Sequence, residues 1–242
     1  MKNSQLPTAT SGFSKLGNVD DSEFSGLDTE ANPPRPRDPG DLAAIHMLEA
    51  AFAASPDIRD LVGQGSAAII VTVPPLWAKS VQKAWAFHFG QTMANGDDTN
   101  SMRWRDSDAP LHIAFVRDEG DQRKSTDGAA IVALALGHGG TAVGFAPNPD
   151  ASLPTALLAA ADATITLQPV DAPHLANVIE EITGTEPSEV IADTITTKIS
   201  PDDLRLAVRS GQDADSAIRR LNAMIAKRQV VPDITLGGAK EG

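Results

Sequence analysis

The sequence predicts an α/β fold: a mostly parallel sheet of about four or five strands flanked by helices, with a small helical subdomain after it. Three observations lead to this prediction. Short apolar runs alternate four times with helix-like segments along the chain. Aromatic residues make up only 4% of the 242 residues, so the core must be built from Ala, Val, Ile and Leu, which suits buried parallel strands. The connections are short, as right-handed crossovers in such sheets allow.

A polar N-terminal tail precedes the fold. Residues 1–40 are rich in Ser, Gly, Pro, Asp and Asn, and their few apolar residues follow neither a helical nor a strand period. Such a segment cannot bury enough surface to offset its conformational entropy, so we expect disorder, with the proline run at 33–39 as a stiff spacer. A passive tail is favoured over a docking tail for a partner.

The α/β domain is expected over residues 41–184. Asp41 is placed to cap its first helix, and Pro74-Pro75 ends its first strand. Periodicity predicts helices at 41–52, 56–62, 76–89, 128–136, 153–161 and 171–183, and strands at 67–73, 111–116, 141–146 and 163–167.

After Gly184 the strand-like runs stop, and residues 185–229 are predicted to form a helical subdomain. The segment Ser200-Pro201-Asp202-Asp203 places an N-cap, a first-turn proline and acidic residues where a helix start needs them. Its three short helices are predicted at 188–194, 201–209 and 213–227. Residues 230–242 have no strong pattern and are interpreted as a linker or truncated stub.

Composition excludes several classes of function. The chain has 32 acidic and 20 basic residues, and its net charge of −12 repels polyanions, so nucleic-acid binding is not expected. The absence of cysteine excludes disulfides and zinc–thiolate sites. No apolar run approaches the ~20 residues that span a bilayer. No apolar segment follows Lys2 as in a secretory signal, so no membrane association is predicted and the cytoplasm is the expected location.

The loop from Gly120 to Gly128 is the candidate for nucleotide chemistry. Lys124-Ser125 lies between a predicted strand and a predicted helix, where a phosphate-binding loop would lie. However, Arg123 stands where that motif has a glycine, and Gly120 is too close to Lys124 for its spacing. A solvated charged loop is therefore favoured, and phosphate binding by Lys124-Ser125 is the alternative.

The histidines do not form a metal-binding pattern. All five are scattered singly, without the spacing of zinc ligands: His46, His88, His112, His138 and His174. His138 lies in a glycine-rich helix cap at the end of the sheet opposite to where sites gather, and it is expected to be an exposed turn residue. His88 is expected to be packed or half-buried on the helix side that carries Trp77 and Trp85.

The polar segment 90–110 is predicted to be a loop that carries the carboxylates Asp97, Asp98, Asp106 and Asp108. Carboxylates of this kind could perform acid–base chemistry or bind Mg²⁺, but loop solubility and local ion pairing explain them equally well. The alternation of Met102 and Trp104 with Arg103 and Arg105 hints at an extra strand or a partner-binding edge. We therefore predict no catalytic residue, no cofactor-binding residue and no metal ligand.

Three stretches carry a family resemblance: 143–162, 178–184 and 199–209. Together they resemble the region that precedes the ATPase module in a group of bacterial AAA+ ATPases, some of them labelled as similar to cell-division ATP-dependent metalloproteases. The resemblance covers roughly residues 45–230. In that family an ATPase module with a phosphate-binding loop, an acidic Mg²⁺ motif and arginine fingers would follow. The sequence ends at Gly242 before such a module, so no family catalytic residue is carried over, and ATP and Mg²⁺ would belong to that module.

The resemblance implies a non-catalytic accessory domain of an ATP-driven machine. Such a domain would bind substrate proteins or protein partners, and it would form homo-oligomers through the ATPase module. The alternative is a small stand-alone α/β nucleotide-binding protein or enzyme that uses the Lys124-Ser125 loop. A structural protein whose tail recruits partners is a third class.

Overall fold

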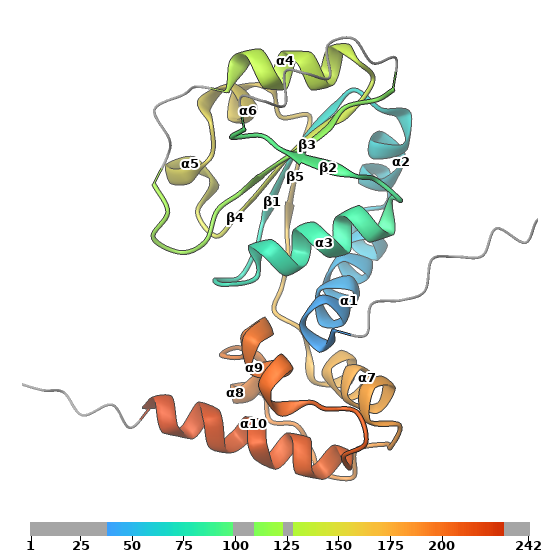
Figure 1. Cartoon of the computed structure of the whole chain (residues 1–242), viewed down its shortest axis with the longest axis vertical. Coiled ribbons are helices and arrows are strands. Elements are labelled where there is room, and N and C mark those ends of the chain that lie inside the picture. Colours follow the sequence, from blue (N-terminus) through green and yellow to red (C-terminus); the bar gives the residue numbers. More distant parts are fainter. Residues whose placement is uncertain (1–37, 99–108, 123–127, 230–242) are drawn as a thin grey trace, which may run out of the picture. The chain divides into compact units, whose positions relative to one another are not determined.

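Five parallel strands form the centre of the fold (Figure 1). They lie in the order β2-β3-β4-β1-β5, and every neighbouring pair is parallel. The strands are β1 (Ala67–Thr72), β2 (Met93–Asn95), β3 (His112–Val116), β4 (Thr141–Ala146) and β5 (Ala163–Thr166). The computed structural model describes residues 38–98, 109–122 and 128–229. The predicted α/β fold is confirmed, while most of the predicted tail and the stretch 230–242 lie outside the described residues.

The helices cover both faces of the sheet. They are α1 (Pro39–Ala54), α2 (Pro56–Gln64), α3 (Ala78–His88), α4 (Ala129–Gly137), α5 (Pro149–Ser152), α6 (Thr155–Ala160) and α7 (Ala172–Thr183). β1 alternates between the two layers, because Ile69 and Val71 pack with α1 and α3 whereas Ala68 and Ile70 pack with α4 and α6. Burial on both faces explains why this strand reads as a continuous apolar run.

The chain after α7 is helical over its described part, with α8 (Asp193–Thr196), α9 (Pro201–Ala207) and α10 (Ala214–Gln229). The predicted capping box at Ser200 is present: its hydroxyl accepts from the Asp203 N–H, and the Asp203 carboxylate accepts from the Ser200 N–H. Buried side chains of α9 and α10, such as Leu204 and Ile218, belong to the same apolar cluster as those of α1 and α3. One continuous core therefore joins the helical subdomain to the sheet's α1–α3 layer.

Two predicted helices differ in their details. Asp38, not Asp41, caps α1, and its carboxylate accepts from the Asp41 N–H at 2.9 Å. The helix predicted at 153–161 is α6, which begins only at Thr155 because Leu153 is extended and Pro154 is the N-cap; the short α5 before it was not predicted.

Two other segments were predicted wrongly. β2 lies inside the segment predicted as a loop, and three residues are too few for an alternating pattern. The helix predicted at 188–194 is absent over most of its length: α8 begins only at Asp193, and the N–H groups of Ser188 and Glu189 donate to the Asp215 carboxylate. The possible strand at Met102 and Trp104 lies outside the described residues. Among the described residues, no helix has the length and apolar character needed to cross a membrane.

Candidate functional site

The strand connections place the candidate site at the carboxyl ends of β1 and β4. The chain leaves β1 through α3 toward the β2 edge of the sheet, whereas it leaves β4 through α5 and α6 toward the β5 edge. Ligands of open parallel sheets bind where two neighbouring strands send their connections in opposite directions. The loop between β1 and α3, residues 73–77, borders this point.

The β1–α3 segment has the outline of a phosphate-binding loop. The motif is strand, Gly-x-x-x-x-Gly-Lys-Ser/Thr, helix. Lys79 and Ser80 occupy its last two positions, while Val73 and Ala78 replace its two glycines. Both replacements are buried, at 3% and 0% exposure. This Lys-Ser pair was not predicted, although its spacing after an apolar strand was a usable signal.

The loop offers few donors to an anion. Phosphate loops bind through successive backbone N–H groups. Pro74 and Pro75 have none. The N–H of Val73 donates to the Ala146 carbonyl at 3.1 Å, and that of Trp77 to the Pro74 carbonyl at 3.2 Å. Four of the five loop residues therefore cannot donate a free N–H to a phosphate.

The end of the loop is pinned by side chains. Leu76 is 55% exposed and has a left-handed backbone with φ of 70°. This conformation costs a residue with a side chain about 1–2 kcal/mol. The next residue, Trp77, is buried, and its indole N–H donates to the Ile199 carbonyl at 3.1 Å. The loop is thus fixed against the segment that precedes α9.

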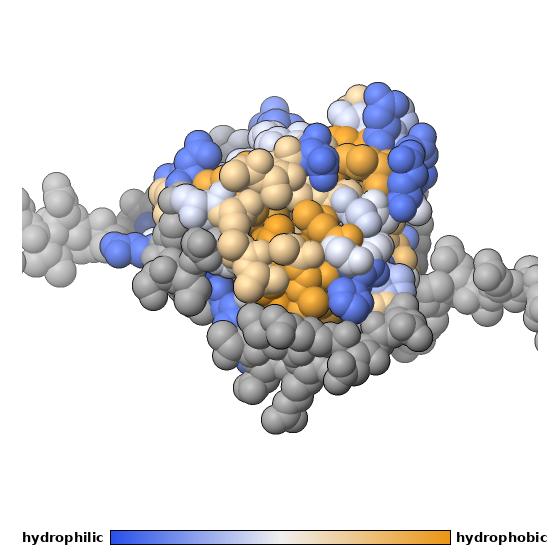
Figure 2. Space-filling view, turned by 90° about the horizontal axis from the view of Figure 1, so that it is seen from above, coloured by the Kyte–Doolittle hydropathy of each residue, from blue (hydrophilic) through white to orange (hydrophobic). Residues whose placement is uncertain are grey.

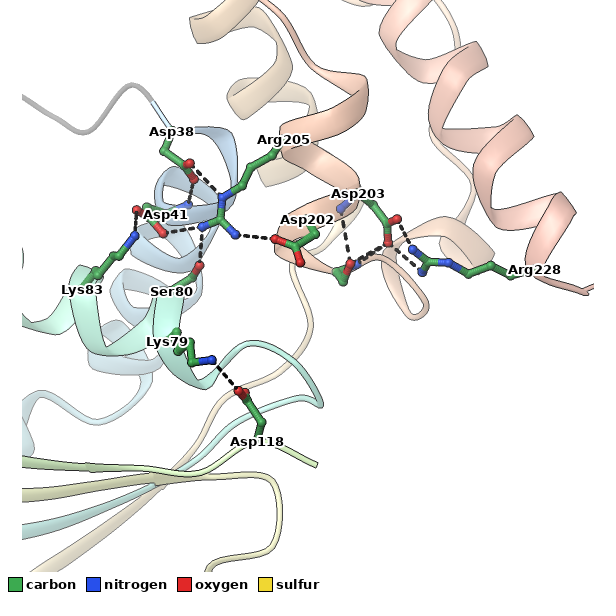
Figure 3. Close-up of polar contacts among 11 residues, drawn as sticks. Asp38, Asp41, Lys79, Ser80, Lys83, Asp118, Asp202, Asp203, Arg205 and Arg228 are labelled. Atoms are coloured by element: carbon green, nitrogen blue, oxygen red, sulfur yellow. Dashed lines mark hydrogen bonds and ion pairs between the residues drawn. The ribbon is translucent and has the colours of Figure 1, made fainter. Parts of the chain in front are cut away.

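Ser80 binds an arginine of the helical subdomain (Figure 3). Its buried hydroxyl accepts from Nη2 of Arg205 at 2.9 Å. The same guanidinium binds Asp38 at 2.8 Å and Asp41 at 2.9 Å, and Lys83 binds the other oxygen of Asp41 at 3.1 Å. In a working phosphate loop the corresponding hydroxyl binds Mg²⁺. Here it belongs to a charged joint, which we call the Arg205 joint, made of Asp38, Asp41, Ser80, Lys83, Asp202 and Arg205.

The electrostatics of the joint favour its ionised form. Partial burial acts to raise the pKa of Asp38, but hydrogen bonds from Arg205 and from the Asp41 N–H hold that pKa below its usual value. The hydrogen bond to Asp38 also raises the pKa of the Arg205 guanidinium. Asp38 and Arg205 therefore stay ionised at neutral pH.

Lys79 points to the end of β3. Its ammonium lies 3.2 Å from the Asp118 carboxylate, but its side chain is 77% exposed. Exposed pairs of this kind contribute about 0–1 kcal/mol, so Lys79 is oriented by Asp118 and not locked by it. Both side chains line a polar pocket of about 580 Å³ that also contains Lys83, Asp97 and Asp121.

Arg117 fills the space at the end of β3. The side chain is 4% exposed, and both of its terminal nitrogens bind the Asp97 carboxylate, at 2.7 and 2.8 Å. Its Nε donates to the Ser152 carbonyl at 3.2 Å. Asp97 is therefore part of a structural ion pair, as the sequence analysis allowed. Asp106 and Asp108 lie outside the described residues, as does Lys124-Ser125.

Among the described residues, one pair of histidines has its rings in contact. His88 is half-buried beside Phe52, as expected, and accepts a hydrogen bond from Arg59 at 2.9 Å. His138 follows α4, before β4, but it is half-buried rather than fully exposed. The pair is His46 and His174, whose rings lie 5.3 Å apart beside a cavity of about 370 Å³ between α1 and α7. No pattern in the sequence predicted this pair.

No metal centre is formed by the described residues, since none of their His, Asp and Glu side chains gather in threes with metal-binding geometry. No protein-family model matches the chain. No curated protein sequence matches it either.

Proposed function

We propose that this chain is a non-catalytic accessory domain of an AAA+ ATPase, in which a phosphate-loop position has become a structural joint. Its role would be to dock a substrate protein or a protein partner for an ATP-driven machine. Nucleotide binding and hydrolysis would belong to a separate ATPase module.

One observation carries the proposal. The chain keeps Lys79 and Ser80 where a phosphate loop needs them, but the hydroxyl of Ser80 is bound by Arg205. Val73 and Ala78 replace the glycines that would let a backbone wrap around a phosphate. The remaining loop N–H groups are mostly absent or already bonded to carbonyls. The geometry thus supports an ATPase-like framework that has lost its anion site.

Analogy with the family supports the same reading. Three segments of the chain resemble the region that precedes the ATPase module in a group of bacterial AAA+ ATPases. A fold-level analogy is a weak argument for function by itself, so the altered loop carries the greater weight.

The first experiment is isothermal titration of the chain with Mg·ATP and Mg·ADP, with thermal unfolding measured in parallel. We expect no saturable heat and no thermal stabilisation. The two measurements check each other, because a nucleotide that bound only the folded state would also raise its stability. Saturable micromolar binding that Lys79→Ala abolishes would overturn the proposal, since the altered loop would then be a working phosphate site.

The same titration tests the stand-alone nucleotide-binding alternative. Gly128 has a left-handed backbone at the N-cap of α4, as a loop that turns into a helix around an anion would need. That alternative predicts binding that Lys124→Ala abolishes and Lys79→Ala leaves intact. The two variants therefore separate the two loops.

The accessory role requires a physical complex. We expect the chain to co-elute in size-exclusion chromatography with a purified AAA+ ATPase module of the same organism, in the presence of ATP. Failure to form a complex with every such module would count against the accessory role, whatever the titration shows.

A further inference from the structure

Strand β2 is one edge of the sheet (Figure 1). It pairs with β3, and no strand among the described residues pairs with its other side. The N–H of Gly96 donates to the Ala114 carbonyl at 2.9 Å, so residues 94 and 96 direct their backbone groups toward β3. Successive residues of a strand direct these groups to opposite sides. Met93 therefore directs its N–H and its carbonyl away from the sheet.

A cavity of about 400 Å³ adjoins the amino end of β2, and two polar side chains line it. One is Gln91, whose side-chain oxygen is buried and has no hydrogen-bond partner among the described residues. The other is His112, whose Nδ1 accepts from the Thr141 N–H at 3.3 Å, so its Nε2 carries the proton and can donate. Native structures satisfy nearly all buried polar atoms. The Gln91 oxygen therefore calls for a donor from outside the described residues.

A second cavity adjoins the carboxyl end of the same strand. It is the polar pocket beside Lys79 and Asp118, and Met93 and Asn95 of β2 contribute to its lining. Met93 lines the cavity at the amino end as well. A strand added beside β2 would direct alternate side chains to the two faces of the sheet. Room for such side chains thus exists at both ends of β2.

The polar groups at this edge form donor–acceptor pairs. Met93 offers an N–H and a carbonyl, and the cavity offers the Nε2–H of His112 and the oxygen of Gln91. A peptide backbone likewise carries one donor and one acceptor on each residue. Hydrophobic surface, such as the area that Figure 2 shows over α4, attracts many kinds of ligand. Paired donors and acceptors at a sheet edge match an extended peptide.

We propose that the β2 edge, made of Met93 and the cavity lined by Gln91 and His112, binds an extended peptide segment of a protein partner. The segment would lie beside β2, with its backbone bonded to Met93 and its side chains in the two cavities. One of its donors would bind the Gln91 oxygen. This inference names the kind of segment that the proposed docking role would recognise, and it rests on that role.

The size of the edge disfavours a second copy of the chain as the occupant. Strand β2 has three residues, and the carbonyl of Asn95 already accepts from the Asp98 N–H at 3.1 Å. Stable interfaces between proteins bury at least about 1,000 Å², which two strands of this length do not supply by themselves. Two copies would also bring together net charges of −12. A peptide needs only the backbone bonds and the cavities beside them.

The test selects peptides from a phage-displayed library of random nine-residue sequences on the full chain and measures their binding by fluorescence anisotropy. Met93→Pro removes the outward N–H, and edge strands tolerate proline where that N–H faces away from the sheet. Met93→Ala, the matched control, also shortens the side chain but keeps the N–H. We expect selected peptides that bind the wild type and Met93→Ala alike and Met93→Pro at least about tenfold more weakly. A selection that yields no such peptide would overturn the proposal.

A second variant keeps the proposal testable if Met93→Pro does not fold. Gln91→Leu removes the buried oxygen, so it should raise the urea midpoint of the protein. The same change should weaken the selected peptides about tenfold, because one of their donors loses its acceptor. Gln64→Leu, at an exposed position of α2, is the control and should leave peptide binding unchanged. Unchanged peptide affinity in Gln91→Leu would contradict the proposal.

Two results would assign the edge to another occupant and so overturn the proposal. Sedimentation that shows a dimer dissociated by Met93→Pro would mean that a second copy pairs with β2. Peptide binding that appears only after residues 99–108 are replaced by a Gly-Ser linker would mean that this segment of the chain occupies the edge. The proposed function is tested separately, by nucleotide titration and by co-elution with an ATPase module, so the two failures are distinguishable.

Discussion

At the scale of single residues, burial and hydrogen-bond direction fix the protonation of two histidines. Arg59 can only donate, so Nε2 of His88 must accept its hydrogen bond. The backbone N–H of Thr141 likewise donates to Nδ1 of His112 at 3.3 Å. Burial lowers the pKa of both imidazoles from 6.5, and the nearby Arg59 charge lowers that of His88 further. Both side chains are therefore neutral in the folded protein at neutral pH.

These shifts predict acid-sensitive stability. Below about pH 6.5 the two imidazoles bind protons more readily in the unfolded chain than in the folded protein. The free energy of unfolding is therefore highest above about pH 6.5 and decreases as the pH falls below it. Urea midpoints measured from neutral pH to about pH 5.5 should decline with falling pH. His88→Gln/His112→Asn keeps an acceptor at each site without a titrating ring, and it should flatten the decline. An equal decline in this variant would refute the assignment.

At the scale of elements, the turn between β1 and α3 contains a strained backbone conformation at Leu76. Pro74 and Pro75 stop β1, and Trp77 must enter the core beside Ile199. The chain makes this turn through Leu76 in a left-handed conformation that normally favours glycine. The Leu76 side chain is 55% exposed, so it gains little from packing.

The strain predicts an unusual order of two variants. At an ordinary position glycine is less stable than alanine by about 0.5–1 kcal/mol. At position 76 the order should reverse, with Leu76→Gly more stable than Leu76→Ala by about 1 kcal/mol, because only glycine relieves the left-handed conformation. Urea unfolding of the two proteins gives the comparison. A less stable glycine variant would mean that the turn is not strained.

At the scale of the whole molecule, the Arg205 joint connects the helical subdomain to α1 and α3 (Figure 3). The joint lies next to a continuous apolar core shared by α1, α3, α9 and α10. Asp203 adds a second connection within the subdomain, since its fully buried carboxylate binds Arg228 of α10. These contacts favour unfolding of the described residues as one unit.

Removal of the Arg205 side chain should lower the stability of this unit, which should still unfold in a single transition. Arg205→Ala leaves the buried carboxylate of Asp41 with less compensation, and we expect a loss of about 2 kcal/mol in the free energy of unfolding. Tryptophan fluorescence and far-UV circular dichroism should report the same single transition. Arg209→Ala is the control, because that side chain is exposed and its Nε donates to the nearby Leu206 carbonyl, far from the joint in its bonding. Two separate transitions in Arg205→Ala would show that the shared core does not couple the parts.

Local signals allowed much of the fold to be predicted. The apolar run of β1, the alternation of strands and helices and the capping box at Ser200 depend on residues close together in the chain. Local signals failed at β2, which is too short for a pattern, and near Ser188, where the backbone N–H binds Asp215, 27 residues away in the chain. The Lys79-Ser80 spacing was also local, but without its glycines it resembled an ordinary helix start.

The sequence by itself determined the fold class, the limits of most elements and the absence of cysteine chemistry, because these follow from composition and short-range periodicity. Tertiary structure alone decided the strand order, the His46–His174 pair and the contact between Arg205 and Ser80, which lie 125 residues apart. It also decided that α4, predicted only as a helix, presents an apolar outer side. Contacts between distant residues leave no periodic trace in a sequence, so the partners of Ser80 could be identified only in the folded chain.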